Sequence, residues 1–191
     1  MKTAIILLFV MMGYGAFAQE TATPQPAGVV MKEAYAKAKA EHKNVILMFH
    51  ASWCGWCKKM TACFEDPTCS KFFDDNYVIT YLDILENPDK KALENPGAPD
   101  MLTSLAGDPK GGVPYWVILT PSGKVLGTSY MPHADGTAGT AKDNIGCPAE
   151  DNEVTYFTAL LKNSSKLNDD QLAVIATRFH KNKPVSTSTG H

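Results

Sequence analysis

Short apolar runs separated by longer amphipathic segments organise this chain. β-Branched, aliphatic and aromatic residues predominate in 45–50, 77–82, 115–120 and 125–130, so each stretch is predicted to be a strand. The second run lacks clean alternation, which is typical of a strand covered on both faces. The last two runs flank Pro121-Ser122-Gly123-Lys124, whose composition predicts a hairpin turn. The pattern therefore predicts an α/β domain with four strands.

Apolar residues at helical spacing occupy much of the remaining chain. The predicted helices cover 29–41, 54–65, 67–75, about 99–106, 149–162 and 168–180. Asp66 and Asn168 are the expected N-caps of the third and the last of these helices. The glycine-rich stretch 131–146 is expected to be irregular. The long connection 83–112 is either an embellished crossover or one wall of a substrate groove.

The two ends of the chain differ from its middle. Residues 1–18 have the features of a signal peptide, with Lys2 before an apolar run and Ala16-Phe17-Ala18 as the cleavage pattern. The apolar run is too short for a comfortable membrane span, and no later stretch predicts stable membrane insertion. We expect cleavage near Ala18 and a periplasmic or secreted protein. The predicted organisation is a flexible lead-in at 19–28, one domain at 29–180 and a disordered tail at 181–191.

Length and charge narrow the class of protein. The chain has 191 residues, enough for one domain with a sizeable core. Its formal net charge is −2 at pH 7, and no basic stripe is present, which argues against nucleic acid as a partner.

The candidate chemistry lies in Cys54-Gly55-Trp56-Cys57. The motif follows a predicted strand directly and opens a predicted helix, which is the setting in which Cys-x-x-Cys indicates redox chemistry. Unpaired backbone N–H groups and the helix dipole at that position stabilise a thiolate on Cys54. Cys57 lies one helical turn further on and is placed to close a disulfide with Cys54.

A metal site or a structural role for the cysteines is a weaker hypothesis, but it stays open. A structural zinc site needs about four ligands, and Cys63, Cys69 and Cys147 form no second Cys-x-x-Cys. No metal and no cofactor is therefore expected. Cys63 and Cys69 could pair in a short structural disulfide. In the alternative, Cys69 is a small buried apolar residue and Cys63 has no special role. Cys147 is left as a candidate free thiol.

The segment Ala51-Ser52-Trp53-Cys54-Gly55-Trp56-Cys57-Lys58 resembles the active-site segment of the thioredoxin-like superfamily, most closely its exported single-domain thiol:disulfide interchange proteins. Gly111-Gly112-Val113-Pro114-Tyr115 resembles the cis-proline loop of the same proteins. The resemblance covers about 29–179. It implies a three-layer α/β/α fold with a central mixed sheet of about four strands, an extended crossover before the cis-proline and two C-terminal helices.

The resemblance also implies roles for single residues. Cys54 is the expected nucleophile and Cys57 the resolving cysteine. Substrate-binding residues are expected at Trp53, Gly55, Trp56, Val113 and Pro114, with Val113 pairing to substrate backbone. Two positions depart from thioredoxins proper. Met48 replaces a buried Asp that moves protons, and Trp56 replaces the usual proline between the cysteines.

The leading hypothesis is a thiol:disulfide oxidoreductase that acts on protein disulfides as a reductase. It would be a monomer recycled by a membrane-bound redox partner. One alternative is an oxidase or isomerase with the same site. Another is a copper chaperone or other binding module that uses Cys54, Cys57 and His50.

Overall fold

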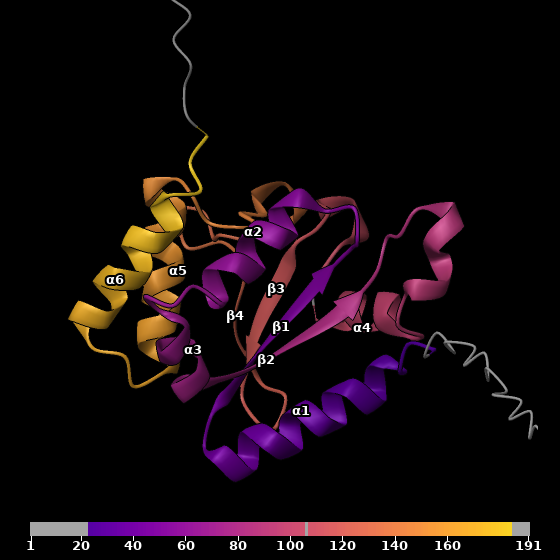
Figure 1. The fold of residues 1–191 in the computed structure, drawn as a ribbon. Coiled ribbons are helices and arrows are strands. Elements are labelled where there is room, and N and C mark those ends of the chain that lie inside the picture. The colour runs from indigo at the N-terminus through magenta and orange to yellow at the C-terminus, as the bar shows by residue number, and fades with distance from the viewer. Residues whose placement is uncertain (1–22, 106, 185–191) are drawn as a thin grey trace, which may run out of the picture.

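A four-stranded mixed sheet forms the centre of the protein (Figure 1). The structure is a computed structural model that describes residues 23–105 and 107–184, so the predicted signal peptide lies outside the described residues. The strands are β1 (Asn44–His50), β2 (Tyr77–Asp83), β3 (Tyr115–Leu119) and β4 (Val125–Thr128). Their order is β2-β1-β3-β4. β1 runs parallel to β2 and antiparallel to β3, while β4 is antiparallel to β3.

The central strand β1 divides its side chains between two cores. Successive side chains of a strand point to opposite faces of the sheet. Ile46 and Met48 therefore pack on one face with both cysteines of the motif. Val45, Leu47 and Phe49 pack on the other face. All five side chains are fully buried, which explains the uninterrupted apolar run in the sequence.

Helices cover both faces of the sheet. On one face lie α1 (Ala27–Glu41) and α4 (Ala98–Ser104). On the other lie α2 (Gly55–Phe64), α3 (Ser70–Asn76), α5 (Asp151–Ser164) and α6 (Asp169–His180). Figure 1 shows α1 below the sheet and α2, α5 and α6 on the opposite side. The predicted three-layer α/β/α, thioredoxin-like fold is confirmed, including its two C-terminal helices.

The connection after β2 is long and ordered. It contains η1 (Pro88–Leu93), α4 and η2 (Pro109–Gly111) before the chain enters β3 through a cis Val113–Pro114 bond. The Asn95 side chain fixes its start, because it accepts from the Asp83 N–H at 2.7 Å and donates to the Gln25 carbonyl at 2.8 Å. The crossover is thereby tied to the residues just before α1.

Local capping was predicted correctly in one case and wrongly in another. The Asn168 side chain accepts from the Gln171 N–H and caps α6 as expected. Asp66 does not cap a helix at 67, because α3 begins only at Ser70. Its carboxylate accepts from the Thr68 N–H and hydroxyl and pairs with Arg178 instead. Asp66, which the local pattern predicted to be an N-cap, thus binds Arg178, a residue distant in sequence.

The ordered structure extends slightly beyond the predicted boundaries. α1 begins at Ala27, whose side chain is buried, two residues before the predicted start. Beyond α6, Asn182 is buried rather than part of a frayed tail. Residues 185–191 lie outside the described residues. None of the helices in the described ranges is both long and apolar enough to span a bilayer.

Candidate active site at the start of helix α2

Cys54 and Cys57 form a disulfide where β1 gives way to α2. The S–S distance is 2.03 Å, and the two Cα atoms are 5.3 Å apart. Cys54 is the N-cap residue of α2, and its sulfur accepts a hydrogen bond from the Cys57 N–H at 3.0 Å. The predicted placement at a helix N-terminus is confirmed. In the reduced protein the same N–H and the helix dipole favour a thiolate on Cys54.

Two tryptophans flank the disulfide and are exposed. Trp53 is 49 % exposed and Trp56 is 41 % exposed, although large aromatic side chains are usually buried. The Trp53 indole N–H donates to the Leu85 carbonyl at 2.8 Å. Lys59 Nζ lies 4.0 Å from the centre of the Trp56 ring. Gly55 faces open space between them, since a Cβ there would meet nothing within 4 Å. The disulfide therefore lies beneath an exposed apolar surface.

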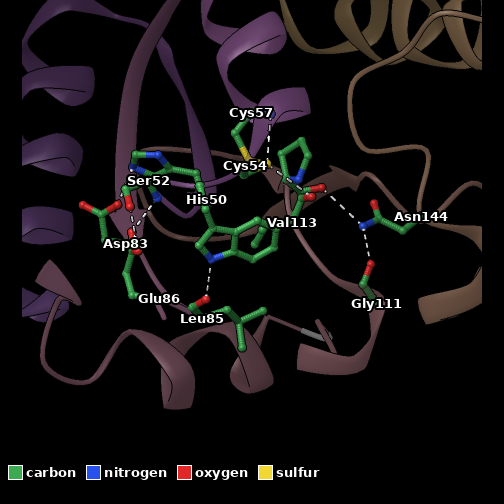
Figure 2. The surroundings of a disulfide bond; sticks show 12 residues. His50, Ser52, Cys54, Cys57, Asp83, Leu85, Glu86, Gly111, Val113 and Asn144 are labelled. Carbon is green, nitrogen blue, oxygen red and sulfur yellow. Dashed lines mark hydrogen bonds and ion pairs between the residues drawn. A yellow bond between two sulfur atoms is a disulfide. The ribbon is translucent and has the colours of Figure 1, made fainter. Parts of the chain in front are cut away.

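The cis-proline loop faces the disulfide. Cys54 Sγ lies 3.5 Å from the Val113 carbonyl oxygen. The Asn144 side chain holds the loop from behind, donating to the Gly111 carbonyl at 2.9 Å and to the Pro114 carbonyl at 3.3 Å. Figure 2 shows Val113, Gly111 and Asn144 on the side of the disulfide opposite Glu86 and Asp83. Asn144 was missed by sequence reasoning, because nothing in its glycine-rich surroundings marks it.

Glu86 holds the turn that precedes Cys54 (Figure 2). It is only 3 % exposed, and its carboxylate accepts from both the N–H and the hydroxyl of Ser52. A buried carboxylate needs such donors to offset its desolvation. Glu86 was also missed by sequence reasoning, since it is one carboxylate among several in a long connection. Because Glu86 contacts Ser52 and Leu85 contacts Trp53, the connection between β2 and β3 forms one wall of the site.

Polar side chains lie in a cavity beside Cys57. Met48 is fully buried in the core that also contains Cys57. A cavity of about 350 Å³ lies beside Cys57, and its lining includes His50, Lys58 and Glu65. His50 Nε2 lies 3.3 Å from Asp83 Oδ1. Burial raises the pKa of Asp83, and the charge of His50 opposes that shift. The cavity thus places polar groups next to Cys57, whose contact with Met48 in the core is apolar.

A second cavity of about 370 Å³ opens on the other side of the site. Its lining includes Trp56, Val113, Pro114, Gly146 and Cys147.

The structure brings together all seven site residues that the sequence predicted, namely Trp53, Cys54, Gly55, Trp56, Cys57, Val113 and Pro114. Within the described ranges, no three His, Cys, Asp or Glu side chains gather as a possible metal site. The remaining cysteines Cys63, Cys69 and Cys147 are free and buried, so no Cys63–Cys69 disulfide is formed.

Residues 18–145 match the family Thioredox_DsbH, described as a protein of unknown function, DUF255. The chain belongs to this thioredoxin-like family. Cys54 and Cys57 are the cysteine pair of this thioredoxin-like domain. The match ends before α5 and α6, so these two helices lie outside the matched region.

Curated relatives share only part of their length with this chain. It is 34 % identical over 106 residues to uncharacterized protein B0495.5 of Caenorhabditis elegans, covering 54 % of this chain and 14 % of that protein. It is 29 % identical over 144 residues to spermatogenesis-associated protein 20 of Rattus norvegicus, covering 74 % and 18 %. It is 33 % identical over 88 residues to protein disulfide-isomerase of Zea mays, covering 46 % and 14 %. The chain thus spans less than a fifth of the length of these relatives.

Solved structures include distant matches. A disulphide isomerase from Xylella fastidiosa Temecula1 is 20 % identical with a TM-score of 0.44, over 59 % of this chain and 77 % of that one. A structure titled DsbH oxidoreductase is 18 % identical with a TM-score of 0.42, over 82 % and 95 %.

Proposed function

We propose that this protein reduces disulfide bonds in other proteins, with Cys54 as the nucleophile and Cys57 as the resolving cysteine. One observation carries the proposal. The Cys54 sulfur caps α2, accepts the Cys57 N–H at 3.0 Å and lies beside the Val113 carbonyl under an exposed apolar surface. That position combines a stabilised thiolate with room for a substrate.

The reaction exchanges one disulfide for another. The Cys54 thiolate attacks one sulfur of the substrate disulfide, which breaks, and the second substrate sulfur leaves as a thiolate. Cys57 then attacks Cys54 Sγ in the mixed disulfide and expels the first substrate sulfur. Two electrons pass from the cysteine pair to the substrate, and the Cys54–Cys57 disulfide of the structure is the product.

The surface around Cys54 supports binding of an extended segment of a substrate protein. Trp53 and Trp56 offer exposed apolar contacts, and Gly55 leaves space between them. The Val113 backbone next to Pro114 offers hydrogen-bonding groups at the opposite wall. We assign substrate binding to these five residues. Such a surface is typical of a protein substrate rather than a small polar one.

Proton release from Cys57 has a different route from that of thioredoxins proper. Met48 supplies no titratable group beneath the thiol. The cavity lined by His50, Lys58 and Glu65 leads from Cys57 to polar groups, and Asp83 lies next to His50. We assign to His50 the role of receiving this proton, directly or through water.

We propose that the mature protein begins after Ala18 and is periplasmic or secreted, with the one thioredoxin-like domain predicted at 29–180, which in the structure extends to Ala27 and Asn182. Residues 1–18 carry the charge and apolar pattern of a signal peptide. In such a compartment a reductase needs a supply of electrons, and we assign that role to a membrane-bound redox partner. The protein is proposed to act as a monomer.

Trapping of substrates tests the assignment of the two cysteines. Cys57→Ser should accumulate mixed disulfides with substrate proteins that carry a disulfide, visible on non-reducing gels and reversed by dithiothreitol. The control Cys54→Ser/Cys57→Ser lacks the nucleophile and should trap nothing. Equal trapping by both variants would refute Cys54 as the attacking residue.

Equilibration with glutathione buffers tests the direction of electron flow. A reductase should have a Cys54–Cys57 midpoint near that of thioredoxin, about −270 mV, whereas isomerases and oxidases lie at about −180 to −120 mV. A midpoint in the higher range would replace the reductase with an oxidase or isomerase that uses the same site.

Metal analysis tests the binding-module alternative. Protein expressed with its export signal and kept reduced should carry no stoichiometric copper or zinc. About one metal ion per chain, lost on Cys57→Ala, would instead favour a metal chaperone that uses Cys54 and Cys57.

A further inference from the structure

We propose that Cys63 and Cys147 form a second dithiol, which disulfide compounds entering the cavity beside Pro114 convert to an intramolecular disulfide. Cys63 lies in the last turn of α2, and Cys147 lies between the cis-proline loop and α5. Both belong to the same core cluster and both are free. This pair is distinct from Cys54 and Cys57, so the proposal goes beyond the function proposed above.

One side-chain amide connects the two sulfurs. Asn182 Nδ2 lies 3.1 Å from Cys63 Sγ and 3.3 Å from Cys147 Sγ, so its two N–H groups donate one to each. An Arg178 N–H donates to Asn182 Oδ1 at 3.4 Å, which fixes the orientation of the amide. Arg178 is in turn held by Asp66. The sulfurs are therefore held side by side by a network built from α6 and the residues after it.

The network also lowers the pH at which the pair of thiols forms a thiolate. Hydrogen bonding from Cys147 lowers the pKa of Cys63 to about 7, assisted by Asn182 and by the charge of Arg178 and opposed by burial and by Asp66. The same pairing and burial raise the pKa of Cys147, against the charges of Lys59 and Arg178. The pair thus loses one proton near neutral pH and keeps the other between its two sulfurs.

Access distinguishes Cys147 from its partner. Cys63 is fully buried, whereas Cys147 lines the cavity of about 370 Å³ that also contacts Trp56, Val113 and Pro114. A small disulfide that enters this cavity therefore meets Cys147 first. Cys69 provides the contrast, because its thiol donates to the Cys63 carbonyl at 3.3 Å and burial raises its pKa.

The oxidation is a balanced thiol–disulfide exchange with a disulfide R–S–S–R. The shared proton moves to Cys63, and the Cys147 thiolate attacks one sulfur, forming a Cys147–S–S–R bond and releasing RS⁻. Cys63 then gives its proton to the released thiolate, attacks Cys147 Sγ and expels the second RS⁻. One protein disulfide forms, one R–S–S–R bond breaks, and two electrons pass from the protein to the compound.

Oxidised glutathione applied to Cys54→Ser/Cys57→Ser tests the proposal without the first pair. The reduced variant has three thiols, and we expect oxidation to leave one that can be alkylated, on Cys69. Peptide mapping should join the peptide of Cys63 to the peptide of Cys147. A Cys63–Cys69 link, or three thiols still free under conditions that oxidise Cys54–Cys57 in the wild type, would overturn the proposal.

Two further measurements separate a built site from chance proximity. Adding Cys147→Ala should remove the cross-link, whereas adding Cys69→Ser should leave it intact. The rate of cross-linking should rise with pH with a midpoint near 7, and Asn182→Ala should shift that midpoint upward, unlike Asn163→Ala at an exposed position. A midpoint at the free-cysteine value of about 8.5 in the unaltered network would contradict the role of Asn182. That profile does not depend on whether Asn182→Ala folds.

Discussion

A cysteine pair lies at each end of helix α2, and the surroundings of the two pairs differ. At the first end, Cys54 is stabilised by a backbone N–H of its own helix and is flanked by exposed Trp53. At the last turn, Cys63 is enclosed, and its donors are the side chains of Cys147, which precedes α5, and Asn182, which follows α6. The helix dipole explains the difference, because it favours an anion at the first end and opposes one at the last.

The comparison shows how one helix supports two kinds of thiol chemistry. A thiolate at the first end needs only the turn that leads into the helix. A thiolate at the last turn needs donors from elsewhere, and Cys147 and Asn182 supply them, with the charge of Arg178 nearby. Arg178 also donates to the Ala62 carbonyl at 3.3 Å, one of the carbonyl groups at the end of α2. The first site is therefore local, and the second depends on tertiary packing.

The largest expected effect is the loss of catalysis on removal of Cys54. Cys54→Ser should lower insulin-disulfide reduction at least ~10³-fold, because no other cysteine has the exposed flank that a protein substrate needs. Cys69→Ser, the matched control, should stay within about twofold of wild type. Residual activity in Cys54→Ser that disappears on adding Cys147→Ala would show that the second pair also reduces proteins.

Alkylation of the reduced protein should separate the two ends of α2. Cys54 should react with iodoacetamide at least about tenfold faster than Cys63 at pH 7, since the reagent reaches Cys63 only after local opening of the structure. Cys54 should also titrate below about 8.5. Time-resolved peptide mapping measures both rates. Equal rates would mean that the packing of α6 gives Cys63 no protection.

Exposed Trp53 should affect substrate binding at the Cys54–Cys57 pair and leave the Cys63–Cys147 pair unchanged. Trp53→Ala should raise KM for a protein disulfide about three- to tenfold, because loss of an aromatic contact costs about 1 kcal/mol. Val174→Ala, another exposed apolar side chain but on α6, serves as control. Cross-linking of Cys63 to Cys147 should be unchanged in both variants. An unchanged KM in Trp53→Ala would exclude that side chain from substrate binding.

Glu86 should stabilise the first site alone. Glu86→Gln leaves one Ser52 donor without a carboxylate partner in a buried position, so the free energy of unfolding should fall by about 1–3 kcal/mol. The change should also lower the reactivity of Cys54 and leave that of Cys63 unaltered. Urea unfolding and alkylation measure the two effects. Glu33→Gln, at an exposed position on α1, should change neither quantity.

The smallest expected effect is on the pH dependence of stability, through Asp66 near the second cysteine pair. Hydrogen bonds from Thr68, with help from Arg178, lower the pKa of Asp66 to about 2, compared with about 3.9 in an unfolded chain. Its stabilising contribution is therefore complete above about pH 4 and is lost as pH falls through about 2. The stability gap between wild type and Asp66→Asn should accordingly narrow over that range. Asp74→Asn, an exposed control on α3, should show no such narrowing.

Most of the framework could be predicted from the sequence because its signals are local. Runs of apolar, β-branched and aromatic residues located the four strands, and the Asn168 cap located the start of α6. The placement of Cys54 at the start of α2 followed from a motif of four residues, since a helical turn brings positions three apart together. The cis Val113–Pro114 bond followed from the resemblance of residues 111–115.

The rest was decided by contacts between residues far apart in the chain. Ser52 and Glu86 are separated by 34 positions, and Cys63 and Asn182 by 119. No spacing rule links such positions, because side chains meet across them only after the sheet and its helices have packed. For the same reason Asp66 was assigned a local cap, whereas folding brought Arg178 to it. The sequence alone therefore determined the first cysteine pair, and only the tertiary structure brought Cys63 and Cys147 to the same Asn182 amide.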